Sequence, residues 1–256
     1  MLRSNQLNGF GVSQQFPILR QANFLVLPIS SRVAIDGTGG FPDIGGNVGT
    51  IVNRGVIGGS LNATTNSNRA TLQSVGVGRL SVRGNATVQP AQTFTALTGA
   101  TVYTIAAFIP RAVSSYERIF DVSLNSSTDG FSNASGGVLL TRDAATSNWG
   151  VYRNGAQRGS VAATINVLTV FETIASTSET RICKDGGTDT VTAHGAIADF
   201  NISSARFLTG HETAGAYSTG SNADVLVGAV FFTNPSADFR SRALAEVRTI
   251  AGIATP

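Results

Sequence analysis

Cysteine and histidine are almost absent from this sequence. Among 256 residues there are one Cys and two His, so Cys183 has no partner for an intramolecular disulfide. One thiol and two distant imidazoles also do not supply the ligand set of a zinc site. Cys183 lies in an apolar–polar alternation, so we expect it to be a small buried residue of a strand.

Charge is also scarce. Charged residues make up 13% of the chain, about half of the usual ~25%. Lys184 is the one lysine, and the arginines that provide most of the positive charge are scattered without a basic run. The net charge of +3 therefore comes with no nucleic-acid-binding patch, and we expect no nucleic-acid partner.

Long apolar runs are missing as well. No stretch of about 18 apolar residues occurs, so we expect no membrane insertion by a helix. Residues 1–21 lack the apolar core and the small-residue cleavage site of a signal peptide. We therefore expect the protein to be made in the cytoplasm.

The residues that are abundant favour strands and tight turns. Glycine occurs 29 times, and short apolar runs alternate with turn residues about every 10–15 residues, which is typical of a sandwich or barrel. The expected strands include 101–109, 118–124, 136–142, 165–176, 180–186, 191–200, 205–210 and 223–232. The fold class is therefore predicted to be all-β.

One helix is predicted at the end of the chain, over 236–251. Ser236 and its neighbours provide the N-terminal cap, and Phe239, Ala243 and Val247 recur at the spacing of one helical face. Gly252 ends it. Residues 1–25, rich in Gln and Asn, differ from the rest, and we interpret them as an N-terminal arm or docking segment. The alternative is a frayed terminus. Residues 26–256 then form one domain.

The order of these elements resembles the concanavalin A-like lectin/glucanase (laminin-G-like) module, in the version found in bacteriophage virion proteins. The resemblance is carried by NRATLQSVGVGRLSVRGN at 68–85, by the strand ADVLVGAVFF and by the terminal helix text SADFRSRALAEVRTIAG. It implies an antiparallel β-sandwich (jelly roll) with one C-terminal α-helix, as a head decoration, fibre or tail-associated adsorption protein that binds host-surface glycans. The alternatives are a carbohydrate-binding module of a bacterial surface and a glycan-cleaving tailspike domain.

The same resemblance implies where the protein acts and with what. We expect it on the virion, attached to other virion proteins through its N-terminal arm, and forming a homo-oligomer, with a trimer as the expected state because phage appendages are symmetric. No cofactor is expected apart from the calcium considered below.

Catalysis is not expected from the carboxylates. Glu117 and Asp121 share a strand face but lie about 13 Å apart, too far for the pair of a retaining glycosidase. Glu172 is a lone carboxylate between apolar residues, and we interpret it as a solvent-facing strand position. His194 and His211 adjoin no nucleophile motif. The sequence thus predicts a protein that is not an enzyme.

Calcium is the one metal considered. Asp121, Asp129 and Asp143 lie in or beside successive loops, and carboxylate oxygens are the ligands that Ca²⁺ prefers. Aspartates are also ordinary turn formers, which is the alternative interpretation of all three.

A sugar site is predicted around the one tryptophan. Trp149, Tyr152, Arg153 and Asn154 combine an aromatic plate with hydrogen-bonding groups. The alternative is a plain hairpin, because Asn154-Gly155 is typical of a type I′ turn. The hairpin would join strands 149–153 and 156–161, with Trp149 half-buried and Arg153 solvated.

Overall fold

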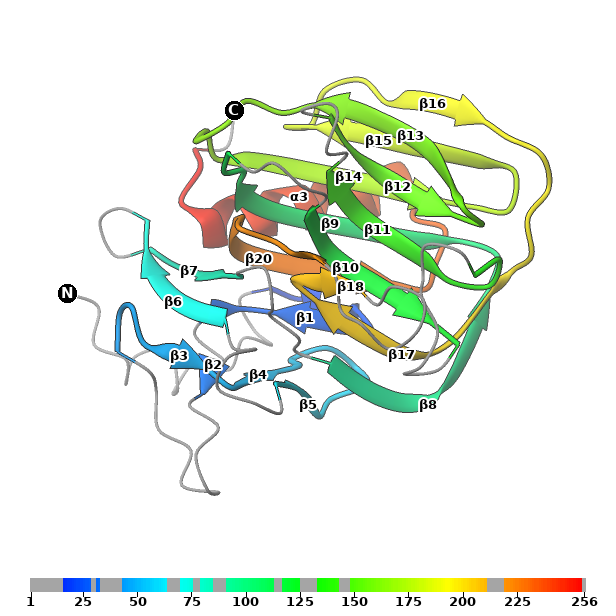
Figure 1. Ribbon diagram of the computed structural model, residues 1–256. Helices are drawn as coiled ribbons and strands as arrows, with labels where there is room; N and C mark the ends of the chain where they lie inside the picture. The colour runs from blue at the N-terminus through cyan, green and yellow to red at the C-terminus, as the bar shows by residue number, and fades with distance from the viewer. Residues whose placement is uncertain are drawn as a thin grey trace.

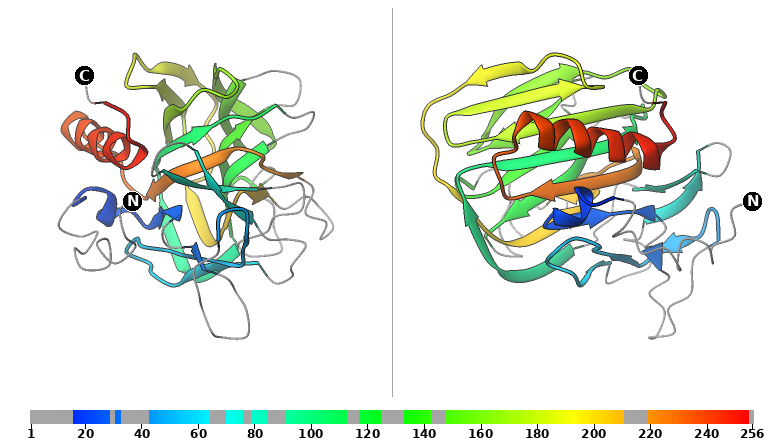
Figure 2. Two further views of the ribbon diagram at one scale, coloured as in Figure 1. Left: turned by 90° about the vertical axis from the view of Figure 1, so that its left-hand side faces the viewer. Right: turned by 180° about the vertical axis from the view of Figure 1, so that it is seen from behind.

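The computed structural model describes residues 16–28, 31–32, 43–63, 70–75, 79–84, 91–112, 117–124, 133–142, 148–210 and 219–254. Two antiparallel nine-stranded sheets face each other, and one α-helix of the described chain, α3 (Ala237–Ala251), covers one of them (Figures 1 and 2). The predicted all-β sandwich with a C-terminal helix is therefore confirmed.

The helix-covered sheet has its strands in an order far from the sequence order. From one edge to the other it contains β16 (Thr190–Ala193), β15 (Glu179–Lys184), β14 (Thr169–Ala175), β9 (Val102–Ile109), β20 (Asp224–Phe231), β7 (Leu80–Arg83), β6 (Ala70–Ser74) and β3 (Asn47–Val48), while β1 (Phe24–Val26) pairs with β20. Its central strands are therefore brought together from distant parts of the chain.

The second sheet carries the predicted hairpin at one edge. Its order is β13 (Ala156–Ala162), β12 (Asn148–Arg153), β11 (Gly137–Arg142), β10 (Glu117–Ser123), β17 (Phe200–Phe207), β8 (Ala91–Gly99), β5 (Ser60–Asn62), β4 (Thr50–Val52) and β2 (Ser31–Arg32). A two-stranded ladder joins β18 (Thr209–Gly210) to β19 (Thr219–Gly220). The strand predicted at 205–210 in fact begins at Phe200.

Strand β9 shows why the helix-covered sheet is apolar on both faces. Val102, Ala106 and Phe108 belong to the core between the sheets. Tyr103 and Ile105 belong to a second core, against the helix. Successive strand residues point to opposite faces, so a continuous apolar run such as 101–109 is the pattern of a strand buried on both sides.

Helix α3 begins and ends where its sequence signals predict. The Ser236 side chain accepts a hydrogen bond from the Phe239 backbone N–H, and Gly252 has a φ of 66° at the C-terminal cap. Ala243 and Val247 are buried against the sheet. No helix among the described residues is long and apolar enough to cross a membrane.

The described part of the expected N-terminal arm belongs to the sandwich. A short 3-10 helix, η1 (Leu19–Gln21), lies beside α3, and Glu246 of α3 accepts hydrogen bonds from the backbone N–H groups of Ile18 (3.0 Å) and Leu19 (2.8 Å). Strand β1 then extends the same layer by pairing with β20. Residues 16–25 are thus packed on their own sheet. The rest of the predicted arm, residues 1–15, lies outside the described residues.

Candidate functional site

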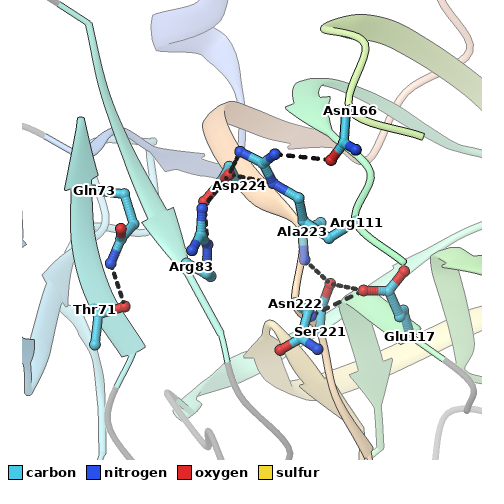
Figure 3. Close-up of polar contacts among 10 residues, drawn as sticks. All are labelled: Thr71, Gln73, Arg83, Arg111, Glu117, Asn166, Ser221, Asn222, Ala223 and Asp224. Atoms are coloured by element: carbon cyan, nitrogen blue, oxygen red, sulfur yellow. Dashed lines mark hydrogen bonds and ion pairs between the residues drawn. The ribbon is translucent and has the colours of Figure 1, made fainter. Parts of the chain in front are cut away.

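Charged side chains gather where several strands begin or end. Asp224, the first residue of β20, pairs in register with Arg83 at the end of β7, and Glu117, the first residue of β10, pairs with Arg142 at the end of β11. Arg111 follows the end of β9. We call Arg83, Arg111, Glu117, Arg142 and Asp224 the charged end; Figure 3 shows four of its members, all except Arg142.

Asp224 is a buried carboxylate held by two guanidinium groups. Arg83 donates from Nε to Oδ1 (2.6 Å) and from Nη2 to Oδ2 (2.8 Å). Arg111 donates to Oδ2 from Nε (2.7 Å) and from Nη2, and its Nη1 donates to Asn166 Oδ1 (2.9 Å). These bonds raise the pKa of Arg83 above its usual value, with the hydrogen bond to Asp224 as the main cause.

The two arginines face solvent while their carboxylate does not. The side chains of Arg83 and Arg111 are 35% and 31% exposed, and that of Asp224 is 0% exposed. Burying a carboxylate is costly unless it is paired and hydrogen-bonded, and here both oxygens are satisfied by the arginines. The result is a pair of partly exposed arginine side chains whose guanidinium groups are fixed in orientation by Asp224.

Glu117 is the second buried carboxyl of the charged end. Its Oε1 accepts hydrogen bonds from the Asn222 backbone N–H (2.9 Å) and the Ser221 hydroxyl (3.4 Å). Its Oε2 is buried without a hydrogen bond from the described residues and lies 4.0 Å from Arg142 Nη1. Desolvation raises the pKa of Glu117 to about 7, against the lowering by Asn222 and Arg142. Glu117 can therefore gain or lose a proton near neutral pH.

The five described residues of the charged end have a positive balance of charge. Three guanidinium groups stand against two carboxyl groups, one of which is partly protonated near pH 7. Such an arrangement attracts ligands that carry negative charge or many hydrogen-bond acceptors.

The sugar site predicted around Trp149 is not an exposed surface. The hairpin is confirmed, since Arg153 pairs with Ala156 and both turn residues have positive φ, 49° for Asn154 and 70° for Gly155. Trp149 is 0% exposed, and its ring lies 4.6 Å from that of Phe108 in the core.

Tyr152 is buried as well, and of the four predicted sugar ligands only Asn154 is exposed. A tryptophan inside the sandwich cannot stack on a sugar from outside, because an inward-pointing strand residue is covered by the opposite sheet. The predicted platform of exposed aromatic rings is therefore wrong.

Arg153 corrects a further expectation, because it is not solvated. It is 0% exposed, its guanidinium lies 3.7 Å from the centre of the Phe200 ring, and it donates to the carbonyls of residues 134, 136, 176 and 198. Desolvation lowers its pKa to about 10, so it remains charged at neutral pH. Arg153 ties the hairpin to three other segments.

The calcium prediction does not gain support from Asp121. Its side chain is 0% exposed, and it forms ion pairs with Arg206 at 3.1 Å and with Arg118 at 3.5 Å. Two cations that already balance the carboxylate would repel Ca²⁺. Asp129 and Asp143 lie outside the described residues. Within the described ranges no group of three or more His, Cys, Asp or Glu side chains is placed to hold a metal ion.

The residues of the charged end were largely missed at the level of sequence. Asp224 interrupts an otherwise apolar run, ADVLVGAVFF, and a lone carboxylate at the start of a buried strand is a usable signal because it needs a cationic partner. Its partners Arg83 and Arg111 are separated from it by 141 and 113 residues, and no sequence spacing identifies them.

Comparisons with known proteins agree with the fold. No protein-family model matches the chain, and no curated protein matches it. Among solved structures, a mutant GH54 α-L-arabinofuranosidase soaked with 4-nitrophenyl α-L-arabinofuranoside is similar at a TM-score of 0.61 and 11% identity, over 94% of this chain and 61% of that one. An arabinofuranosidase complexed with arabinofuranosyl-α-1,2-xylobiose gives 0.56 and 10%, over 90% and 59%.

A Trypanosoma rangeli sialidase has a lower TM-score of 0.47 at 11% identity, over 93% of this chain and 38% of that one. The chain thus spans less than two thirds of the length of these proteins. At such identities the likeness shows the fold alone.

The two arabinofuranosidases contradict the prediction that the protein is not an enzyme. That prediction rested on two observations. The fold resembled a lectin-like module, and the sequence lacked the pattern of carboxylates found in glucanases. The arabinofuranosidases of similar fold are glycosidases, and therefore carbohydrate-active proteins. The absence of one carboxylate pattern from the sequence is therefore no argument against activity on this fold.

Proposed function

We propose that this protein recognises glycans and that the charged end is its binding surface. The observation that carries the proposal is the pair of partly exposed guanidinium groups, Arg83 and Arg111, fixed on the buried carboxylate of Asp224. Donors that are already oriented lose little entropy on binding, and guanidinium groups bind carboxylate and hydroxyl oxygens of sugars. The glycosidases of similar fold support a glycan as the ligand.

The expected ligand is an acidic glycan, one whose sugars carry carboxylate groups. The charged end has an excess of positive charge, and an arginine can bind a carboxylate through two parallel hydrogen bonds. A neutral glycan would form hydrogen bonds with the same donors but would gain no ion pair, so it should bind more weakly.

Binding of acidic and neutral oligosaccharides to the full chain tests this proposal. Arg111→Lys keeps the charge but loses the planar fork, and we expect at least a ~10-fold loss of affinity for the acidic ligand. Arg242→Lys is the matched control, because Arg242 is 55% exposed and pairs only at 3.8 Å with Asp238 on the helix. Equal affinity of both variants, or a lack of binding to any acidic oligosaccharide, contradicts the proposal.

A second candidate function is hydrolysis of the bound glycan, with Glu117 as proton donor. It is favoured by the pKa of about 7 of this carboxyl, as a general acid requires. Because the Glu117 side chain is 0% exposed, the reaction also requires the chain that covers it to open, so that the glycosidic oxygen can reach the carboxyl. In this step water adds to the anomeric carbon, the glycosidic C–O bond breaks, and Glu117 gives its proton to the leaving oxygen. The attacking water releases one proton to solvent, and Glu117 takes up a proton from solvent before the next turnover. The glycosidases of similar fold also support it.

Release of reducing ends from a bound oligosaccharide tests the second candidate. Wild type should release them, and Glu117→Gln should bind the same ligand without releasing them. If wild type binds an oligosaccharide and leaves it intact over days, hydrolysis is refuted while glycan recognition stands.

We further propose that the protein is carried on a bacteriophage particle as a decoration, fibre or adsorption protein. The resemblance of the sequence segments 68–85, 223–232 and 236–252 to such proteins supports this location. In this proposal residues 1–15 reach other virion proteins, and the assembled state is a trimer. Mass spectrometry of purified particles should detect the chain, and its absence from them would refute the location.

A further inference from the structure

A second polar site lies beside α3 and shares no residue with the charged end. A hollow of about 500 Å³, largely open to solvent and called the cavity below, lies between the N-terminal half of α3 and the turn that follows β15. Figure 2 shows α3 lying across the outer face of the sheet, where it packs on β9, β20 and β14. Its size is within the range of sites for small ligands.

The turn beside this cavity is tight and is hydrogen-bonded to the helix, since Arg248 Nη2 donates to the Asp185 carbonyl (2.7 Å). The Gly187 backbone N–H donates to the Lys184 carbonyl (3.0 Å), and Asp185 and Gly186 have φ values of 55° and 75°, as in a type I′ turn. A Cβ on Gly186 would lie 2.7 Å from Leu244 Cδ2. Any other residue here would have to displace the end of the Leu244 side chain and adopt a positive φ, which favours glycine.

Glu172 is the buried acceptor on the wall of the cavity. Its side chain is 4% exposed, which corrects the expectation of a solvent-facing strand position. Oε2 accepts hydrogen bonds from Tyr103 Oη (2.8 Å) and Arg240 Nε (3.2 Å). Because both bonds go to one oxygen, Oε1 remains as an acceptor for a ligand.

Arg240 connects the two carboxylates of the cavity. Its Nη1 and Nη2 donate to Asp189 at 2.8 and 2.7 Å. The bond to Arg240 is the main cause that lowers the pKa of Asp189, so Asp189 stays ionised and cannot serve as a proton donor. Three of the five N–H groups of Arg240 are used in these contacts, which leaves two for a ligand.

The charges of the cavity restrict the ligand class. Two carboxylates and one guanidinium give the lining side chains a net charge of −1, which disfavours anions. The guanidinium between the carboxylates disfavours a metal ion, because like charges repel. Cys183 lines the cavity but is no nucleophile, since desolvation raises its pKa to about 11.

What fits is a neutral molecule with several hydroxyl groups. It can donate to Glu172 Oε1 and accept from the two remaining N–H groups of Arg240. The hydroxyl groups of Thr188 and Ser241 on the cavity wall can both donate and accept. A sugar ring offers hydroxyls on adjacent carbons, in pairs that match an acceptor beside a donor.

We propose that the cavity lined by Glu172, Asp189, Arg240 and Ser241 is a binding site for a neutral monosaccharide unit, separate from the charged end. It provides the protein with a second point of contact for a glycan. Two weak sites on one rigid body increase the total affinity for a ligand or surface that spans them.

Titration of the ¹⁵N-labelled full chain with D-glucose, D-galactose and L-arabinose tests the site by NMR. We expect the amide signals of Gly186 and Gly187 to shift saturably with at least one sugar, with a Kd of about 1 mM. D-Glucuronate should shift them less. If none of the neutral sugars shifts these signals saturably, the proposal is refuted.

Variants on exposed helix positions locate the binding. Ala237 lines the cavity and is exposed, so Ala237→Trp should fill it and abolish the shifts. Ala245→Trp, at an exposed position of α3 that is not part of the cavity, should leave them unchanged. Shifts that persist in Ala237→Trp would place the sugar elsewhere and overturn the proposal.

Glu172→Gln examines the acceptor itself. The Gln oxygen can keep the bonds from Tyr103 and Arg240, while its NH₂ group replaces the open oxygen with a donor. We expect a ~10-fold weaker Kd, and an unchanged Kd would refute the role of Oε1. Arg111→Lys should leave the response intact, so failure of this site and failure of the charged end can be distinguished.

Discussion

The raised pKa of Glu117 makes a quantitative prediction about stability. The unfolded chain titrates this carboxyl at its usual value of 4.5, and the folded chain at about 7. The folded state therefore binds the proton more tightly, so the contribution of Glu117 to stability is complete below pH 4.5 and is lost as the pH rises through 7. Each pKa unit corresponds to ~1.4 kcal/mol, which makes the total loss about 3 kcal/mol.

Urea unfolding between pH 4 and 8.5 measures this loss. The variant Glu117→Gln has no proton to exchange, so the difference in unfolding free energy between wild type and variant removes the titration of all other groups. As the pH rises across this range, we expect wild type to lose about 3 kcal/mol of unfolding free energy relative to Glu117→Gln. This loss corresponds to a shift of about 1 M in urea midpoint for an m-value of ~3 kcal/mol/M. If the unfolding free energies of the two proteins change with pH in parallel, the conclusion that burial raises the pKa of Glu117 is refuted.

The remaining predictions concern the buried polar contacts and the core, and each is measured by urea unfolding. Asp224→Asn should cost about 3–5 kcal/mol, because the two guanidinium groups then lack their shared counter-charge; a loss below ~1 kcal/mol would contradict the pairing. Arg153→Met should cost at least ~3 kcal/mol, since four carbonyls lose their donor. Trp149→Ala should cost about 3–5 kcal/mol, and a loss of glycan binding at unchanged stability would instead indicate an exposed sugar platform.

Local sequence signals predicted the parts of the fold that depend on neighbours in the chain. The positive φ values of Asn154 and Gly155 follow from the chemistry of a two-residue turn. The cap at Ser236 and the apolar face of α3 follow from helix spacing. These features need no knowledge of what packs against them.

Strand β8, Ala91–Gly99, was not predicted, because its side chains are partly or fully exposed and give no apolar alternation. Its place in the sheet comes from pairing with β17, about 100 residues further along the chain. A strand that depends on its partner in this way leaves little trace in its own composition.

The candidate sites could not be predicted in the same way, because the role of each side chain depends on which residues cover it in the folded chain. Alternation places Arg153 on one face of its strand, but it does not reveal that the Phe200 ring and four carbonyls enclose the guanidinium. Glu172 looked like a surface residue for the same reason. Its partners Tyr103 and Arg240 lie 69 and 68 residues away in the sequence, on β9 and on α3. Only the folded chain brings them together.

The structure of the full chain with a bound acidic oligosaccharide tests the central claim most directly. The account predicts a sugar carboxylate or hydroxyl within hydrogen-bond distance of the Arg83 or Arg111 guanidinium, with the contacts of Asp224 retained. A bound acidic oligosaccharide located elsewhere on the protein, with both guanidinium groups left to solvent, would contradict it.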